Sequence, residues 1–296
     1  MKCSTPTEKD HIQLIECPRD AWQGITKFIP TSKKTNYIKQ LLSCGFYGID
    51  VGSFVSPKAI PQMKDTQLIF ESIKECSNKT RLLAIVANTK GAEMGGQFPH
   101  LDDFGFPFSI SETFQMRNTH KTIEESYEEL QRILEISNKF QKEMVVYLSM
   151  GFGNPFNETW NYEIVTYWLE KLTKLGIKTI SLSDTIGCST PKQIKQVFTN
   201  ALQNHPTVNF GAHLHSEAHN SIEKLNAAFE AGCRRFDGAI QGVGGCPMAS
   251  TQLIGNMPTE KMISYFTENK IDFGVDVLRF ESCYNTAKRL FENYTT

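Results

Sequence analysis

Two histidines separated by one residue, His213 and His215, are spaced so that they can bind one cation. Side chains at positions i and i+2 of a strand point to the same face, so both imidazoles reach the same ion if this segment is a strand. A carboxylate from another strand, such as Asp20, would complete a mixed nitrogen and oxygen site suited to Mg²⁺, Mn²⁺ or Zn²⁺. The alternatives for Asp20 are a helix N-cap and an ion pair with Arg19.

A glycine-rich segment, Gly-Val-Gly-Gly-Cys-Pro at residues 242–247, presents a second reactive group, Cys246. Glycines permit sharp bends and close approach of the backbone to a ligand, which indicates a loop beside a site. A single cysteine is more often inert packing, but one flanked by glycines and proline packs poorly. Cys246 is therefore a candidate for acid–base or nucleophilic chemistry, provided that a nearby cation lowers its pKa.

Short segments rich in β-branched and aromatic residues alternate with amphipathic segments along the chain. The predicted strands are residues 12–17, 48–54, 82–87, 104–109, 144–150, 179–183, 209–215 and 235–240. The predicted helices are residues 31–44, 56–76, 122–140, 158–175, 191–204 and 217–231, with two more near the C-terminus. This pattern predicts an α/β protein in which residues 1–296 form one (β/α)8 TIM barrel with a C-terminal helical extension.

An open doubly wound sheet is the alternative fold, and it usually shows a glycine-rich phosphate loop after its first strand. The sequence contains no G-x-G-x-x-G and no Walker motif, which favours the barrel. Reactive groups of such a barrel project from the C-terminal ends of the strands and from the loops that follow. The polar residues at these positions are Arg19, Asp20, Gln23, Asp50, Ser53, Ser111, Glu112, Tyr147, Ser149, Ser183, Asp184, His213, His215 and Asn256.

The charge and composition exclude several classes of protein. With 31 basic and 32 acidic residues, the formal net charge is −1, which offers no basic surface for a nucleic acid or an anionic membrane. No apolar run approaches the ~18 residues of a membrane span, and the N-terminus lacks a signal-peptide core, so we expect a cytoplasmic protein. The eight cysteines include no C-x-x-C pair and are expected to be reduced thiols.

Four motifs resemble those of the 3-hydroxy-3-methylglutaryl-CoA (HMG-CoA) lyase family, which is part of the metal-dependent lyase and Claisen-condensing TIM barrels. They are Ser-Phe-Val-Ser-Pro-Lys at 53–58 with Pro-Gln-Met at 61–63, Ser-Asp-Thr-Ile-Gly at 183–187, His-Leu-His at 213–215 and Gly-Val-Gly-Gly-Cys-Pro at 242–247. Arg19-Asp20 and Gly255-Asn256 also match, so the resemblance extends over nearly the whole chain. It implies cleavage of HMG-CoA to acetyl-CoA and acetoacetate, a reaction of leucine degradation.

The resemblance also implies roles for individual residues. The positions that match ligands of a divalent cation, Mg²⁺ or Mn²⁺ with Zn²⁺ as a further option, are Asp20, His213, His215 and Asn256. The predicted catalytic residues are Arg19 for the developing enolate, Cys246 for proton transfer, His213 or His215 for the hydroxyl proton, and Asp50 and Asp184. The predicted substrate contacts are Gln23, Ser53 and Tyr147. The expected partners are an acyl-CoA substrate and a second copy of the chain in a homodimer.

Three positions depart from the family pattern. Ala21 replaces the glycine after the metal-binding aspartate, Asp50 replaces a glutamate, and Val145 replaces an arginine two residues before Tyr147. We therefore expect the reaction type to be retained more firmly than the acyl group. Two alternatives stay open: a related metal-dependent aldolase or Claisen-type condensing enzyme, and a non-catalytic barrel that binds a metal or ligand. The Gly-Gly-Cys-Pro loop favours the lyase over the condensing enzymes.

Overall fold

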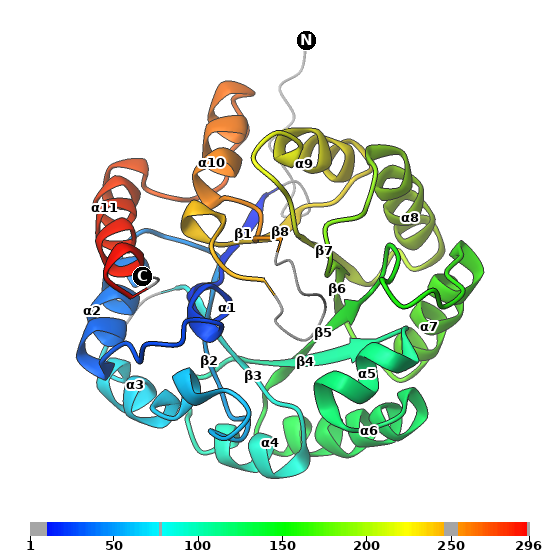
Figure 1. Ribbon diagram of the computed structural model, residues 1–296, viewed down its shortest axis with the longest axis horizontal. Helices are drawn as coiled ribbons and strands as arrows, with labels where there is room; N and C mark the ends of the chain where they lie inside the picture. Colours follow the sequence, from blue (N-terminus) through cyan, green and yellow to red (C-terminus); the bar gives the residue numbers. More distant parts are fainter. Residues whose placement is uncertain (1–10, 77–78, 246–253, 295–296) are drawn as a thin grey trace.

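Eight parallel strands close into a barrel in the order of the sequence, and the last strand pairs with the first (Figure 1). The computed structural model describes residues 11–76, 79–245 and 254–294. The strands are β1 (Gln13–Glu16), β2 (Gly48–Ser53), β3 (Arg81–Ile85), β4 (Asp103–Ser109), β5 (Glu143–Ser149), β6 (Thr179–Asp184), β7 (Asn209–Leu214) and β8 (Arg235–Gly238). The predicted (β/α)8 barrel is confirmed, and each predicted strand overlaps an observed one.

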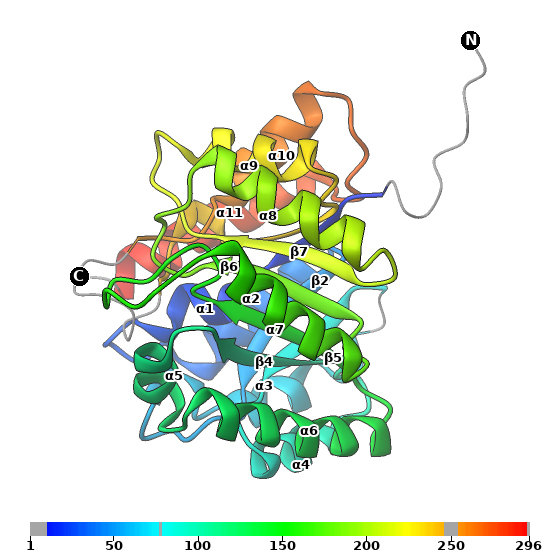
Figure 2. The same ribbon diagram turned by 90° about the vertical axis from the view of Figure 1, so that its right-hand side faces the viewer.

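Helices surround the barrel in Figure 1, and Figure 2 shows the strands from the side, between α4 and α6 below and α8 to α10 above. The α-helices are α1 (Pro18–Gln23), α2 (Thr31–Leu42), α3 (Thr66–Ile73), α4 (Thr89–Gly96), α5 (Glu112–Thr119), α6 (Ile123–Lys139), α7 (Tyr162–Lys174), α8 (Pro191–Asn204), α9 (Ser221–Glu230), α10 (Thr259–Glu268) and α11 (Val277–Tyr294). Two short 3₁₀ segments are η2 (Pro61–Met63) and η3 (Ile240–Gly242).

The sequence predicted most of the longer helices well, and their ends have local causes. A capping box starts α6, in which the Thr122 side chain accepts from the Glu125 backbone and the Glu125 side chain accepts from the Thr122 backbone. The single helix predicted over residues 56–76 is wrong. It is broken into η2 and α3, because Pro61 cannot continue a helix and the preceding Ile60 is extended. The short helices α1, α4 and α5 were not predicted.

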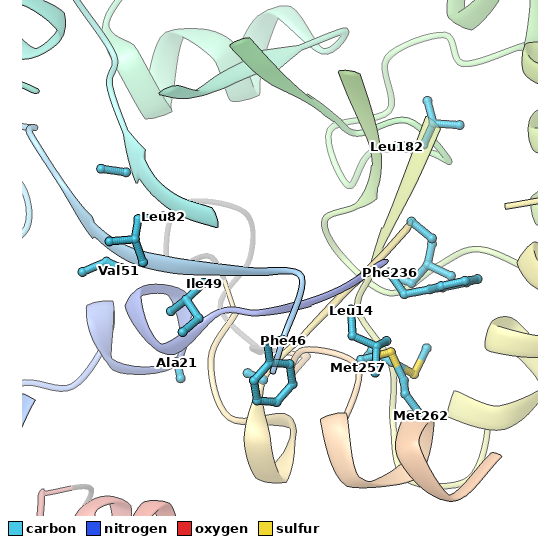
Figure 3. Packing of buried hydrophobic residues seen from close by; sticks show 14 of the residues in the cluster. Leu14, Ala21, Phe46, Ile49, Val51, Leu82, Leu182, Phe236, Met257 and Met262 are labelled. Carbon is cyan, nitrogen blue, oxygen red and sulfur yellow. The ribbon is translucent and has the colours of Figure 1, made fainter. Parts of the chain in front are cut away.

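Alternation along the strands divides buried residues between the barrel interior and the layer under the helices. Outward-facing apolar side chains join the helices in the main core, part of which is shown in Figure 3, where Leu14, Phe236, Met257 and Met262 belong to one buried cluster. The opposite faces of the strands point into the barrel and are far more polar. The helical layer therefore supplies the apolar burial, which leaves the strand ends free to present functional groups.

The C-terminal helix α11 packs beside α2, as predicted for a helical extension of the barrel (Figure 1). The Arg279 side chain donates to the Ser43 carbonyl, and the thiols of Cys44 and Cys283 lie 3.3 Å apart. Cys17, Cys44, Cys188, Cys233 and Cys283 form no disulfide with one another. No helix in the same ranges is long and apolar enough to span a membrane.

Candidate active site at the barrel mouth

A cavity of about 630 Å³ opens at the C-terminal ends of the strands, within the size range of small-molecule sites. The helix α1 contributes Arg19, Asp20 and Gln23 to its wall. The strand ends contribute Ser53, Ile85, Pro107, Tyr147, Ser149, Ser183, His213 and His215. The cavity lies at the end of the barrel where the fold predicts reactive groups, and it brings most of the predicted site residues together.

Asp20, His213 and His215 form a compact group of metal-ligating side chains inside this cavity. One potential ligand atom from each residue lies within 4.8 Å of the other two, and all three residues are buried. The strand β7 directs both imidazoles to the same side, as the i and i+2 spacing predicted, and α1 brings the carboxylate to them. One oxygen and two nitrogen ligands suit Mg²⁺, Mn²⁺ or Zn²⁺. The donor set and its spacing thus fit one divalent cation.

The protonation states of the group also favour a cation. Burial and the neighbouring His213 lower the pKa of His215 to about 4, so this imidazole is neutral at pH 7. Burial opposes the ionisation of Asp20, but Arg19 and the two histidines outweigh it and hold the pKa of the carboxyl below its usual value. A neutral imidazole and a carboxylate are the forms that bind metals.

The two imidazoles are oriented by different partners. His215 Nδ1 lies 2.9 Å from the Ile254 carbonyl oxygen, whereas His213 Nδ1 lies 3.3 Å from Asp237 Oδ2. Each acceptor favours a proton on Nδ1, which leaves Nε2 as the nitrogen with a free lone pair. The predicted ligands are therefore both presented through the same ring atom.

Asn256, the fourth predicted ligand, lies beside the group and contacts Asp20 through its amide nitrogen. Asn256 Nδ2 donates to Asp20 Oδ2 at 2.7 Å and to the Val243 carbonyl at 2.9 Å. Direct coordination would use the other amide atom, Oδ1. Gly244 explains the close approach of this loop, because it has φ +120° and a methyl group there would overlap the Asn256 amide.

Arg19 is a buried cation fixed by three side chains. Its Nε and Nη2 donate to Asp50 Oδ2 at 2.9 and 2.5 Å, and its Nη1 donates to Asp20 Oδ1 and to Gln23 Oε1, both at 2.9 Å. Burial opposes the charge, but Asp50 and Asp20 raise the pKa of Arg19 further, so it stays protonated. The site therefore offers a rigid positive charge next to the candidate metal ligands, where an anion developing on a substrate would be stabilised.

An apolar cluster lies inside the barrel beside the cavity, and three of its residues, Val55, Ile85 and Tyr147, belong to the cavity wall. Leu83, Ile85, Val145 and Tyr147 form a buried cluster inside the barrel, with Val55 packed against it. The Tyr147 ring stands edge-on to His213 with ring centroids 5.4 Å apart. Its hydroxyl is buried and finds no hydrogen-bond partner among the described residues.

Residues 12–286 match the family model described as HMGL-like. A hydroxymethylglutaryl-CoA lyase from Bacillus subtilis is 31% identical, with 93% of this chain and 90% of the relative aligned. The chain belongs to the HMGL-like family. A second relative, the 3-hydroxy-3-isohexenylglutaryl-CoA/hydroxymethylglutaryl-CoA lyase of Pseudomonas aeruginosa, is 28% identical, with 90% of this chain and 88% of the relative aligned.

Solved structures of HMGL-like proteins share the whole fold. An HMG-CoA lyase from A. baumannii, in complex with coenzyme A and 3-methylmalate, superposes with a TM-score of 0.89 at 30% identity. The match covers 97% of this chain and 93% of that one. The Bacillus subtilis HMG-CoA lyase structure gives a TM-score of 0.88 at 29% identity, covering 96% of this chain and 94% of that one. The resemblance predicted from the motifs is confirmed at the level of the family.

The structure explains how this HMGL-like protein accommodates two of its departures from the family pattern. Ala21 lies in the helix α1 with a negative φ, so this position does not need the conformational freedom of glycine. Asp50, although shorter than glutamate, reaches Arg19 directly. Burial raises the pKa of Asp50 to about 6, and its Oδ1 is buried with no hydrogen-bond partner among the described residues.

The third departure, Val145, lies inside the barrel and is not among the residues that line the cavity. The resemblance implied an arginine here, whereas Val145 is buried in the apolar cluster beside Leu83 and Tyr147. Ser53, a predicted substrate contact, lies in the cavity wall, where its hydroxyl donates to the Ile85 carbonyl at 3.3 Å. The wall near Ser53 therefore combines polar groups with the apolar side chain of Ile85.

Asp184, a predicted catalytic residue, faces away from the cavity and is not among the residues that line it. Its Oδ2 is paired with Lys224 Nζ at 2.7 Å, and both side chains are fully buried. Lys224 also donates to the carbonyls of Gly187 and His215 at 2.8 and 2.9 Å. The contacts of Asp184 thus brace the loops after β6 and β7, and the geometry gives no support to a catalytic role.

One predicted site residue cannot be placed in the structure, and four residues near the site were not predicted. Cys246 falls in residues 246–253, outside the described part of the chain. The sequence reasoning missed three basic residues of the cavity wall: Arg117, His120 and Lys121. Three basic side chains within five positions after a predicted strand were an available signal. Asp237 was also missed, because nothing in the sequence marks an inward-facing aspartate as a partner of His213.

Proposed function

We propose that this protein is a divalent-metal-dependent HMG-CoA lyase that cleaves HMG-CoA to acetyl-CoA and acetoacetate. The observation that carries the proposal is the group of Asp20, His213 and His215 directly beside the buried cation Arg19. Membership of the HMGL-like family and relatives named as HMG-CoA lyases support the same reaction. A protein that only binds a ligand would not need a fixed positive charge next to a group of metal-ligating side chains.

The reaction breaks the bond between C2 and C3 of the substrate. A divalent cation held by Asp20, His213 and His215 would polarise the tertiary hydroxyl on C3 and lower its pKa. Loss of the hydroxyl proton lets the C3 oxygen form a ketone as the bond breaks, which releases acetoacetate and leaves the bonding electrons on C2. Burial opposes protonation of both histidines, but Asp237 raises the pKa of His213, whereas that of His215 is lowered to about 4. We assign the relay of the hydroxyl proton to His213, whose Nε2 takes the proton in a state in which this nitrogen does not bind the cation.

The second fragment leaves as the enolate of acetyl-CoA and needs a positive charge and then a proton. Arg19 is fixed by Asp20, Asp50 and Gln23, so it supplies its charge without reorganising. Cys246 is assigned the delivery of the proton to C2, on the basis of its match to the family motif. Replacing Cys246 with alanine should lower turnover sharply while Mn²⁺ affinity is retained; unchanged turnover would remove it from the mechanism.

The cavity suits an acyl-CoA in both shape and charge. Lys58, Arg117 and Lys121 lie in its wall, where they can contact phosphates, although Lys121 also pairs with Glu129 at 3.0 Å. Lys90, in contrast, is exposed on α4 and is not part of the wall. The A. baumannii structure contains coenzyme A, which supports a thioester substrate for this chain. A homodimer and a cytoplasmic location stay predictions, as does the place of the reaction in leucine degradation.

The function is tested by following both products. The purified protein, reconstituted with Mn²⁺, is incubated with HMG-CoA, and acetoacetate and acetyl-CoA are quantified. We expect equal amounts of the two products and no product after chelation. An absence of both products, when an authentic HMG-CoA lyase gives them in parallel, would contradict the proposal. Turnover of another branched 3-hydroxyacyl-CoA alone would keep the reaction type and change the substrate.

A further inference from the structure

Asp237 lies inside the barrel, in contact with His213 and away from the cavity wall. Residues alternate along β8, so Asp237 and Arg235 face inward while Phe236 faces the helices. Asp237 Oδ2 lies 3.3 Å from His213 Nδ1 and accepts a hydrogen bond from Ser181 Oγ at 2.9 Å. The carboxylate is fully buried, which means that its contacts are protein groups and are not shared with bulk solvent.

Arg235 balances the charge of this carboxylate. Its Nη2 lies 3.7 Å from Asp237 Oδ1, and both side chains are buried in the barrel interior. Gly211 on β7 leaves room for the arginine, because a methyl group at that position would lie 2.9 Å from Arg235 Cδ. A buried carboxylate without a nearby cation would be costly. The interior is therefore built to keep a negative charge under His213.

The two candidate metal-ligating histidines differ in the kind of partner that holds them. His215 is held by the backbone carbonyl of Ile254, which comes with the fold, whereas His213 is held by the side chain of Asp237. A carboxylate that accepts from Nδ1 fixes the tautomer and the ring orientation and raises the basicity of Nε2. Only the partner of His213 can be removed by a substitution.

We infer that Asp237 is a positioning residue that fixes the ring and the tautomer of His213, so that Nε2 points to the divalent cation. Ser181 and Arg235 hold the carboxylate in place for this task. The inference rests on the metal site of the proposed function and assigns a further residue to it. It requires that loss of the Asp237 charge weakens metal binding itself, before any substrate is present.

The test measures Mn²⁺ binding to the full chain by calorimetry without substrate, for the wild type and for Asp237→Asn. We expect the dissociation constant to rise about 10- to 100-fold in the variant. In assays with HMG-CoA, the Mn²⁺ concentration for half-maximal activity should rise in the same proportion, while KM for the thioester stays unchanged. A purely structural role would lower the thermal stability without this selective change.

A matched control is Asp103→Asn. Asp103 is also a buried carboxylate of the barrel interior, but it pairs with Arg81 and not with a histidine. This variant should lose stability and keep the Mn²⁺ affinity of the wild type. Ser181→Ala is a milder second variant that keeps the charge of Asp237 and removes one of its hydrogen bonds. It should weaken Mn²⁺ binding roughly two- to tenfold, and it decides the question if Asp237→Asn does not fold.

Three results would overturn the inference. Wild-type Mn²⁺ affinity in Asp237→Asn would do so, as would wild-type affinity in Ser181→Ala if that variant has to decide. An equal loss of affinity in Asp103→Asn would assign the effect to the barrel interior in general. A wild-type protein that binds no Mn²⁺ would instead contradict the metal site of the proposed function, and the inference with it. The wild-type titration therefore separates the two failures.

Discussion

The two sides of the barrel mouth are built in opposite ways. The charged side consists of Arg19, Asp20, His213 and His215, which are buried and fixed by hydrogen bonds and ion pairs. On the apolar side, Val55, Ile85 and Tyr147 line the cavity and pack against Leu83 and Val145 inside the barrel, and the Tyr147 hydroxyl has no partner among the described residues. We propose that the charged side performs bond cleavage and that the apolar side selects the acyl group.

The departures from the family pattern follow this division. Asp50 supports Arg19 by a direct ion pair, and Ala21 lies in the helix that carries Asp20, so the charged side keeps its arrangement. Val145 packs against the apolar side from inside the barrel, where the resemblance implied an arginine. The reaction type is therefore expected to follow the family, while the preferred substituent on C3 is free to differ.

The largest effect is expected from Asp20→Asn on the charged side. The substitution keeps the shape of the side chain but removes the only carboxylate of the metal-ligating group that the described residues form. We expect Mn²⁺ binding to be lost and kcat/KM for HMG-CoA to fall by about 10³-fold or more. The matched control is Asp103→Asn, which changes a buried carboxylate that pairs with Arg81 and lies outside the metal-ligating group. Loss of Mn²⁺ binding in that control would show that the effect is not specific to Asp20.

Arg19→Met should have the next largest effect. It keeps an unbranched apolar side chain but removes the charge that faces a developing enolate, so kcat should fall about 10²- to 10³-fold. The substitution also leaves Asp50 buried without its cation. The double variant Arg19→Met with Asp50→Asn removes that carboxylate and should restore stability without restoring kcat. Recovery of kcat in the double variant would show that Arg19 acts only by neutralising Asp50.

Ile85→Ala tests the apolar side. The side chain lies in both the cavity wall and the apolar cluster, so its truncation enlarges the space for the substituent on C3. We expect the kcat/KM ratio between a longer 3-alkyl substrate and HMG-CoA to rise about tenfold, with Mn²⁺ affinity unchanged. Competition between the two thioesters measures this ratio directly. A loss of Mn²⁺ affinity, or an unchanged ratio, would contradict the proposed division between the two sides.

The smallest effect on the metal site is expected from Glu16, which lies outside both sides of the mouth. Burial raises the pKa of Glu16 to about 8, although the Thr259 hydroxyl and the Ile240 amide donate to it. The pKa is raised on folding, so the unfolded chain loses the proton first. The free energy of unfolding should therefore fall as the pH rises from about 4.5 to about 8, by at most about 5 kcal/mol.

Glu16→Gln should flatten this decline in stability, as measured by urea unfolding at several pH values. The Mn²⁺ affinity of the variant should equal that of the wild type at each pH, because Glu16 does not belong to the metal-ligating group. A decline of the same size in the variant would show that another group is responsible. This experiment separates the pH dependence of folding from that of the site.

The sequence predicted the barrel because its signals are local and repeated. Eight strand segments with helical segments between them indicate one architecture, and the spacing of His213 and His215 indicates a shared face before any contact is known. The prediction of one helix over residues 56–76 was wrong because prolines override an amphipathic pattern. The short helix α1 was not predicted because its six residues follow a strand directly and are held by contacts with β2 and η2.

The residues of the charged side could be predicted in part from the sequence, but the buried residues that hold them in place could not. Motifs identified Arg19, Asp20 and the histidines, but their mutual distances depend on how α1 folds over the strand ends. The two buried partners Asp237 and Lys224 appear in the sequence as ordinary polar residues of a strand and a helix. Asp184 illustrates the converse: its motif predicted a catalytic residue, whereas its carboxylate is paired with Lys224. Such pairings depend on burial and long-range contacts, which a single sequence does not reveal.

The most direct test of the account is an anomalous difference map from crystals grown with Mn²⁺. We expect one strong peak at the barrel mouth, in contact with Asp20, His213 and His215. The map also shows whether the Asn256 amide turns its oxygen to the ion. A peak at a different place, or no peak at Mn²⁺ concentrations that support turnover, would contradict the central claim that the charged side is a metal centre.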